Sequence, residues 1–259
     1  MSYVTSHSTN IYYESHGDGP TTLIFAHGMG GNAAIWFNQL AHFGSKYRIV
    51  AFDHRYFARS KCSEDDFKPE WFADDVIAIM DAENIDSAIF VCQSMGGWTG
   101  SQMAIHHPER VKALVMSHTP GVFAHASAVS DRRAVADLVS RPAASAFSTP
   151  ALAVDYPEKN LAGAVLYSQI SSFNFIDPAV IPRKIGNMAV DIDSLTDYHV
   201  PTLFITADKD VLFPPSFIKA LAEALGAAYR NLGDAGHSSY FEAPEVFNET
   251  LETFIETVS

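Results

Sequence analysis

The sequence predicts an α/β fold with a mostly parallel central sheet flanked by helices, and three observations predict it. Short apolar runs alternate with longer helical patterns along the 259 residues. The runs are mostly apolar, which is typical of parallel strands buried on both faces. The hydrophobic content of 47% is sufficient for a core on each side of such a sheet.

Five apolar runs are predicted to be strands of this sheet: residues 22–26, 47–52, 87–91, 111–117 and 201–206. Two sets of apolar residues recur at helical spacing and predict helices that face the core. These sets are Trp71, Phe72, Val76, Ile79 and Met80, and Val246, Phe247, Leu251, Phe254, Ile255 and Val258. The alternation of strands with helices predicts parallel pairing.

Two further segments lie outside this alternation. Residues 3–6 and 11–14 are β-like runs on either side of Thr9 and Asn10, and predict a hairpin that leads into the sheet. Residues 121–193 are rich in Ala and Ser and lack a strong strand pattern, which predicts a mainly helical cap inserted into a core of residues 1–120 and 194–259. This cap segment contains Pro142, Pro150, Pro157, Pro178 and Pro182.

Composition excludes several classes of partner. The formal net charge is −13 and no cluster of Lys and Arg occurs, so neither nucleic acid nor a membrane surface is an expected partner. No stretch approaches the roughly 18 apolar residues of a membrane span. The polar first ten residues and the presence of only two cysteines, Cys62 and Cys92, predict a cytoplasmic protein without a disulfide framework. The oligomeric state is left open.

The strongest chemical signal is a serine at the end of an apolar strand. Ser94 follows the run 88–92 and Gln93, and is itself followed by Met95, Gly96 and a helical pattern. A tight strand-to-helix turn of this kind exposes a nucleophilic serine hydroxyl and directs the next backbone amide at the reacting oxygen. The usual motif is Gly-x-Ser-x-Gly, and this chain has Cys92 at the first glycine position.

A glycine-rich loop after the first parallel strand predicts an oxyanion hole. It comprises His27, Gly28, Met29, Gly30 and Gly31, and it lacks the Lys-Ser/Thr pair of a nucleotide-binding loop. We expect the backbone amides of Met29 and Met95 to bind a developing oxyanion. His27 is interpreted as structural.

An acid and a histidine complete the pattern in the order Ser, Asp, His. Asp208 and Asp210 follow the last apolar run and compete for the role of the acid, and His237 lies in a glycine-flanked loop before the final helix. No metal site is predicted, because the adjacent His106 and His107 cannot share one helical face.

With these motifs the chain resembles the α/β-hydrolase superfamily along nearly its whole length. The resemblance implies Ser94 as nucleophile, His237 as base and Asp210 as acid, since the acid in such proteins usually lies four residues before a proline, here Pro214. Residues 53–60 depart from the family pattern Asp-x-Arg-Gly-x-Gly-x-Ser, because both glycines are replaced. We interpret Tyr56 and Phe57 in this segment as surface residues, with the pocket mouth as the alternative.

The predicted function is that of a serine hydrolase that cleaves a small, apolar carboxylic ester or lactone without a cofactor. Trp98, just after the serine turn, and the aromatic residues of the cap are candidates for lining the pocket; equally, they could only join cap to core. The cap aromatics are Phe123, Phe147, Tyr156, Tyr167, Phe173 and Phe175. Alternatives are carbon-carbon hydrolysis of a diketone-type substrate, a cofactor-independent oxygenase or perhydrolase, and a ligand-sensing relative. Haloalkane dehalogenases and epoxide hydrolases are disfavoured because they carry aspartate where this chain has Ser94.

Overall fold

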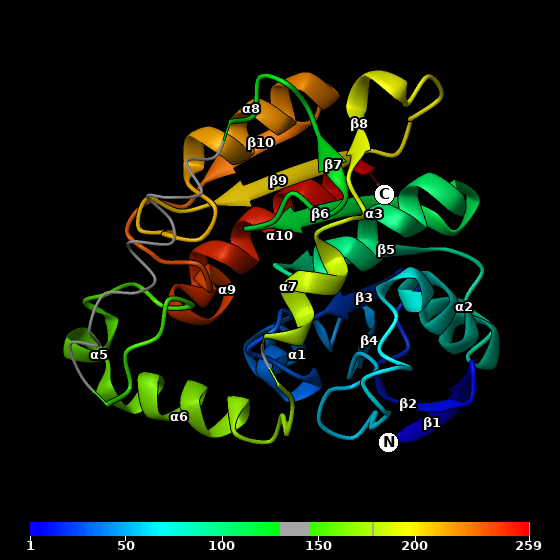
Figure 1. Ribbon diagram of the computed structural model, residues 1–259, viewed down its shortest axis with the longest axis horizontal. Helices are drawn as coiled ribbons and strands as arrows, with labels where there is room; N and C mark the ends of the chain where they lie inside the picture. The colour runs from blue at the N-terminus through cyan, green and yellow to red at the C-terminus, as the bar shows by residue number, and fades with distance from the viewer. Residues whose placement is uncertain (130–145, 178, 259) are drawn as a thin grey trace.

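The computed structural model describes residues 1–129, 146–177 and 179–258, and its main sheet confirms the predicted, mostly parallel architecture. Within these residues the sheet has eight strands in the order β1-β2-β4-β3-β5-β6-β9-β10 (Figure 1). Their bounds are Ser2–Ser6 (β1), Thr9–His16 (β2), Thr22–Ala26 (β3), Arg48–Phe52 (β4), Ala88–Gln93 (β5), Val111–Ser117 (β6), Thr202–Thr206 (β9) and Ala228–Asn231 (β10). β1 and β2 pair antiparallel, as do β2 and β4, and every other pair is parallel.

All five predicted parallel strands are present. β3 and β6 have the predicted bounds, β4 and β9 begin one residue later than predicted, and β5 begins one residue later and ends two residues later. β10 was not predicted, because its four residues are largely exposed at the edge of the sheet and lack an apolar run.

The amino-terminal hairpin is present, but the predicted position of its turn is wrong. Ser6 pairs with Thr9, so the turn is His7-Ser8, and Thr9 and Asn10 belong to β2. His7 and Ser8 both have positive φ, at 42° and 67°. Two successive left-handed residues match the right-handed twist of the flanking strands, which explains the two-residue turn.

Helices cover both faces of the sheet (Figure 1). One face packs against α2 (Phe72–Ala82), α3 (Gly96–His106) and α8 (Pro215–Leu225). The other packs against α1 (Phe37–Phe43), α9 (Ser239–Glu242) and α10 (Pro244–Val258). In α10, Phe247, Leu251 and Ile255 follow one another at four-residue spacing and are fully buried. Burial of each contributes about 1.5–3 kcal/mol, which fixes this helix beside the loop that carries His237.

The segment predicted as a cap contains three short helices in its described part. They are α5 (Tyr156–Lys159), α6 (Leu161–Ser171) and α7 (Val180–Ile185). Two-residue strands, β7 (Phe123–Ala124) and β8 (Val190–Asp191), pair in parallel where the segment leaves and rejoins the core. Part of the predicted cap, with Pro142 and Pro178, lies outside the described residues, and the cap boundaries stay a prediction.

The loop of residues 53–60 corrects one interpretation. Phe57 is fully buried beside Phe67 and Phe72, so it is not a surface residue, and Tyr56 is partly buried. Tyr56 and Ala58, which replace the family glycines, adopt positive φ of 80° and 37°. The Asp53 carboxylate holds this strained loop by accepting the backbone N–H of Ala33 at 2.7 Å and the Nε–H of Arg59 at 2.7 Å.

Candidate active site

Ser94 lies in a strained turn between β5 and α3. Its φ is 49°, a left-handed value that non-glycine residues rarely adopt. Its N–H donates to Ser117 O at 3.0 Å, which ties the turn to the carboxyl end of β6. A Cβ at Gly96 would lie 2.2 Å from Ala26 O, so only glycine permits this close approach of helix to strand. The local geometry is that of the predicted nucleophile turn.

Cys92 at the first glycine position of the motif is accommodated by a second glycine. The thiol is fully buried, and a Cβ at Gly100 would lie 2.5 Å from Cys92 Sγ. Gly100, one turn into α3, therefore makes the room that the larger side chain needs. This departure from the usual motif leaves the position of Ser94 intact.

The glycine-rich loop after β3 lies directly against the serine turn. A Cβ at Gly28 would lie 2.9 Å from Ser94 Cβ and 2.1 Å from Gln93 Oε1. Among the described residues, neither the Met29 N–H nor the Met95 N–H donates to a protein acceptor. Both amides thus keep a free donor beside Ser94, as the predicted oxyanion hole requires.

The His27 ring supports the glycine-rich loop through hydrogen bonds. Its Nε2 accepts the N–H of His54 at 3.0 Å, so its Nδ1 carries the proton and donates to Gly28 O at 2.8 Å. Burial lowers the pKa of His27 to about 4. The ring is therefore neutral at neutral pH and acts as a brace for the loop rather than as a catalytic base.

This brace makes stability depend on pH. The folded-state pKa of His27, about 4, lies below the value of 6.5 in an unfolded chain, so acid favours the unfolded state. The contribution is complete above pH 6.5, and we expect the free energy of unfolding to fall by about 3 kcal/mol from this group as pH drops toward 4. Urea unfolding of wild type and His27→Gln across this range measures it. If the free energy of unfolding changes equally with pH in the two proteins, the assignment is wrong. His54 is also buried with a lowered pKa, but it contributes equally to both proteins and does not affect the comparison.

Asp210 and His237 are in direct contact, whereas Asp208 takes no part. Asp210 Oδ2 lies 3.0 Å from His237 Nδ1, and Asp210 Oδ1 accepts the backbone N–H of Leu212 and Phe213 at 2.9 and 3.0 Å. Asp208 is exposed and accepts from Asn231 Nδ2. Burial favours the neutral acid, but the attraction of His237 and the donated hydrogen bonds outweigh it and hold the pKa of Asp210 well below its usual range.

His237 is held next to the serine turn through its backbone. Gln93, the residue before Ser94, donates from Nε2 to His237 O at 3.1 Å. The His237 ring is buried, and its Nε2 has no hydrogen-bond partner among the described residues, Ser94 included. Such contacts are often long without substrate and shorten in the complex. The free Nε2 is the atom that the predicted base requires.

The structure adds to the site a residue that no sequence motif indicates. His118 follows the last residue of β6, is fully buried, and places Nδ1 2.8 Å from Asp210 Oδ2. Its Nε2 lies 2.7 Å from Ser239 Oγ. The signal was its position at the carboxyl end of a parallel strand, where functional side chains of α/β folds gather.

These side chains also form a candidate metal-binding group within the described residues. One ligand atom each from His118, Asp210 and His237 lies within 4.8 Å of the others. The contacts at 2.8 and 3.0 Å are hydrogen bonds, and a metal ion at the same atoms would have to displace both Nδ1 protons. The arrangement fits hydrogen bonding without a metal.

Trp98 lies close to the site but has a structural partner. Its indole N–H donates to Ile185 O at 3.2 Å, which ties α3 to α7. The ring packs in an apolar cluster with Met95 and Phe57. Its predicted role in the pocket stays a prediction.

The described cap aromatics range from buried to exposed, and Phe147 is half-buried. Phe123, Tyr156 and Tyr167 are buried, while Phe173 and Phe175 are exposed. A Cβ at Gly30 would lie 2.7 Å from the Tyr167 hydroxyl, so α6 lies over the glycine-rich loop. Tyr167 is therefore a cap aromatic that the structure brings next to the predicted oxyanion hole.

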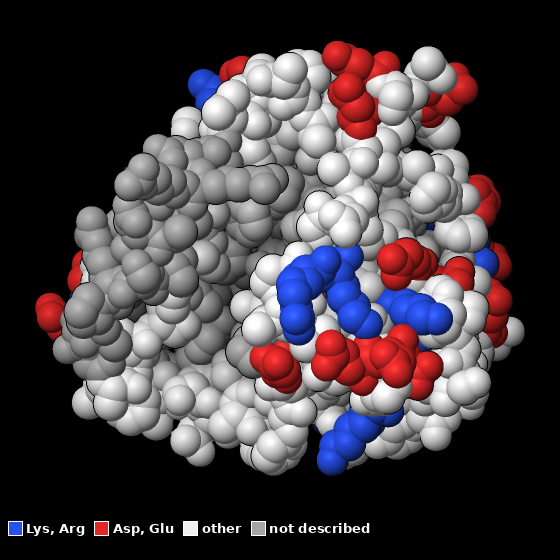
Figure 2. Space-filling model, viewed as in Figure 1, with Lys and Arg blue, Asp and Glu red and all other residues white. Residues whose placement is uncertain are grey.

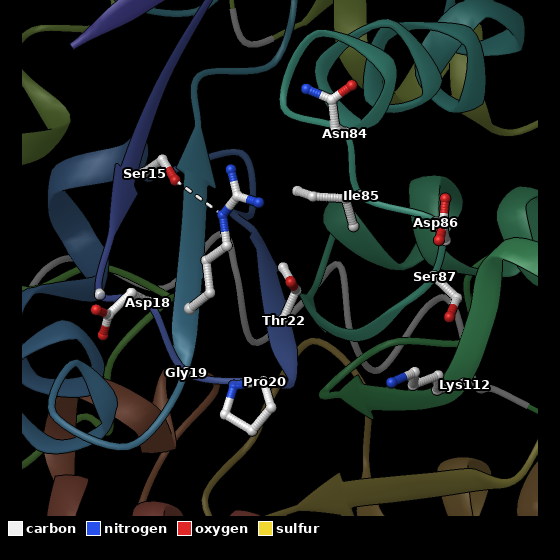
Figure 3. A pocket seen from close by; sticks show the side chains of 12 residues that line it. Ser15, Asp18, Gly19, Pro20, Thr22, Asn84, Ile85, Asp86, Ser87 and Lys112 are labelled. Carbon is white, nitrogen blue, oxygen red and sulfur yellow. Dashed lines mark hydrogen bonds between the residues drawn. The ribbon is translucent and has the colours of Figure 1, made fainter.

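A polar hollow of about 580 Å³ lies at the amino ends of the parallel strands, whereas Ser94 lies at their carboxyl ends (Figure 3). Thr22, Ser87 and Lys112 line it, at or beside the amino ends of β3, β5 and β6. Arg48 in its wall is already bound to Ser15 Oγ at 3.4 Å and to Glu83. Because open parallel sheets bind ligands at the carboxyl ends of their strands, the candidate site is the one around Ser94.

The charges on the face seen in Figure 2 are mixed. Lys and Arg side chains gather there, with Asp and Glu side chains immediately beside them. This face is not uniformly basic. In the described part of the chain, no helix combines the length and apolar character that crossing a membrane requires.

Comparison with known proteins finds relatives that match nearly the whole chain. A family model described as alpha/beta hydrolase fold matches residues 21–244. The 3-oxoadipate enol-lactonase 2 of Acinetobacter baylyi is 26% identical, over 98% of this chain and 96% of its own length. The "Putative carbamate hydrolase RutD" of Variovorax paradoxus is 31% identical, over 96% of this chain and 97% of its own length. Among solved structures, the enol-lactonase from Burkholderia xenovorans LB400 superimposes with a TM-score of 0.80 at 23% identity, covering 98% of this chain and 100% of that one.

Proposed function

Because this chain belongs to the α/β hydrolase fold family, we propose that it is a serine hydrolase that cleaves a small carboxylic ester or lactone through an acyl-enzyme on Ser94. The observation that carries the proposal is the buried 3.0 Å contact between His237 Nδ1 and Asp210 Oδ2, which leaves His237 Nε2 free beside the serine turn. In that tautomer, Nε2 is able to take the proton of Ser94.

The reaction runs in two acyl transfers. Ser94 Oγ attacks the acyl carbon as its proton passes to His237 Nε2, and the N–H groups of Met29 and Met95 stabilise the oxyanion. The bond to the leaving oxygen then breaks, and His237 returns the proton to that oxygen. Water attacks the acyl-enzyme by the same route, which releases the acid and restores Ser94. No metal or organic cofactor enters this scheme.

The cap is proposed to bind the apolar part of the substrate. Asn32 Nδ2 donates to Ile170 O at 3.0 Å and Asn174 Nδ2 to Gly31 O at 2.9 Å, so the α6 region is tied to the oxyanion loop. Met95 and Trp98 belong to an apolar cluster that includes cap residues. An uncharged acyl group fits such surroundings better than an ionic one.

The names of the two relatives described above indicate two classes of substrate, lactones and carbamates. The Acinetobacter baylyi relative is named an enol-lactonase, which favours a cyclic ester. The Variovorax paradoxus relative is named for carbamate hydrolysis, in which the same serine chemistry would act on a carbonyl flanked by nitrogen and oxygen. Carbamates are therefore the second candidate substrate class.

The test is a substrate panel with wild-type protein: p-nitrophenyl esters of increasing acyl length, simple lactones and enol-lactones, a carbamate ester, and a 1,3-diketone. We expect turnover of esters or lactones and an intact-mass increase equal to the acyl group. Selective carbamate turnover would favour the second class. Cleavage of the diketone alone, giving an acid and a ketone, would replace the proposal with carbon-carbon hydrolysis, and inactivity on every substrate would favour an oxygenase, perhydrolase or ligand-sensing role.

A further inference from the structure

Two histidines share one oxygen of the candidate catalytic acid. His118 Nδ1 and His237 Nδ1 lie 2.8 and 3.0 Å from Asp210 Oδ2, while two backbone amides occupy Asp210 Oδ1. A carboxylate offers about four acceptor positions, and here four donors fill them. The mechanism proposed above uses the donor from His237 and leaves His118 without a task.

The contacts of His118 define its protonation state. It is fully buried, and burial lowers its pKa, so the ring is neutral. Because the carboxylate accepts only, Nδ1 carries the proton and Nε2 accepts the hydroxyl proton of Ser239 at 2.7 Å. A chain of hydrogen bonds therefore runs from Ser239 through His118 and Asp210 to His237.

We propose that His118 is a positioning residue that holds the Asp210 carboxylate in place and, by sharing Oδ2, sets the basicity of His237. The proposal rests on the serine-hydrolase function proposed above. Its first part follows from the fourth hydrogen bond, which prevents the carboxylate from turning. Its second part follows from the competition of two donors for one oxygen. The hydrogen bond from His118 reduces the negative charge on Asp210 Oδ2 and so weakens the attraction of Asp210 for protonated His237.

The expected direction of the effect follows from the charges around the pair. The ionisable groups that act on His118 are Asp210 and His237, whose ring centroid is 5.6 Å away. Glu242 on α9 faces His237, and its carboxylate accepts the N–H of Ala153 at 3.0 Å. Removing the His118 donor leaves these charges in place and strengthens the hold of Asp210 on protonated His237. The acid limb of the kcat/KM pH profile should therefore move to higher pH.

Two substitutions separate the donor from the ring. His118→Asn keeps an N–H near the position of Nδ1 and suits the φ of 55° at this residue, because asparagine tolerates left-handed backbone. His118→Leu removes the donor at similar volume. We expect the acid limb of the kcat/KM pH profile to shift upward by about half a unit to one unit in His118→Leu, and to stay within about 0.2 units of wild type in His118→Asn.

If His118 acts only in packing, both variants lose activity while the acid limb of the kcat/KM pH profile stays at its wild-type pH. That result would overturn the proposal, and so would a shift of the acid limb to lower pH. If His118→Leu does not fold, His118→Gly replaces it, because glycine adopts this φ without strain. The same upward shift is expected there.

Nitrogen-15 NMR of histidine-labelled wild type tests the geometry without any substrate. It should show His118, identified by its loss in His118→Asn, as a neutral Nδ1–H tautomer between about pH 5 and 9. An Nε2–H tautomer or a titration near 6.5 would refute the hydrogen-bond chain. Failure of the serine-hydrolase function would appear separately, as activity retained by Ser94→Ala.

Discussion

Ser94→Ala should lower kcat/KM on the best ester or lactone by at least about 10⁴-fold while the fold is kept. The hydroxyl oxygen is the atom that would form the acyl bond, so no nearby group replaces it. Alanine has the same Cβ as serine, and the strain of the φ at 49° is therefore nearly unchanged. Circular dichroism and thermal unfolding close to wild type would show that the loss is chemical.

Ser101→Ala is the matched control for this change. Ser101 lies on α3, which follows the turn of Ser94; it is buried, donates to Gly97 O at 2.7 Å and accepts the N–H of Val122 at 3.0 Å. Losing both bonds should cost about 2–3 kcal/mol of stability but leave turnover within a few fold. The intact-mass increase on incubation with substrate should appear in Ser101→Ala and be absent in Ser94→Ala. Activity retained by Ser94→Ala would remove Ser94 from the mechanism.

The parts of the fold that could be predicted from sequence are those where one physical effect dominates. β3 and β6 are largely apolar because both faces of the sheet are covered, with the exposed Lys112 near the start of β6 as an exception, and their bounds were predicted correctly. The turn at His7-Ser8 was misplaced because this pair is not one of the Asn-Gly or Asp-Gly pairs that usually mark a two-residue hairpin turn. The pairing of Ser6 with Thr9 places it. Phe57 was misplaced because its burial depends on Phe67 and Phe72, which reach it only in three dimensions.

The candidate site shows the same division. Local motifs identified Ser94, His237 and the two aspartates, but choosing Asp210 over Asp208 required resemblance to a family. Geometry gives a physical basis for that choice: Asp210 is buried against His237, and Asp208 bonds to Asn231 at the surface. His118 is 92 residues from Asp210 in sequence, and only the adjacency of β6 and β9 brings the two together. No local pattern contains that information.

The distinction between the two aspartates predicts the second large effect. Asp210→Asn should reduce kcat/KM by about 10⁴-fold, whereas Asp208→Asn should change it less than about threefold, as expected for an exposed side chain. The carboxylate of Asp210 accepts four N–H donors, and an amide offers one acceptor oxygen together with an NH₂ group. Some donors must then face the NH₂ group. His237 would relieve this by moving its proton to Nε2, which can then no longer accept from Ser94.

Asp210→Asn can lose activity because the chemistry fails or because the protein unfolds, and measuring stability together with activity separates the two. The depressed pKa of Asp210 means that its carboxylate stabilises the fold above the unfolded value near 4, and that this contribution is lost as pH falls through the folded value. Asp210→Asn should therefore unfold at lower urea concentration than Asp208→Asn at pH 7, and its activity loss has to be measured where both variants are fully folded. A large loss in Asp208→Asn with little in Asp210→Asn would transfer the acid role to Asp208. Equal, small losses of activity in both variants would show that the mechanism needs neither carboxylate. His237 would then keep its Nδ1–H tautomer without Asp210 and would still accept the proton of Ser94.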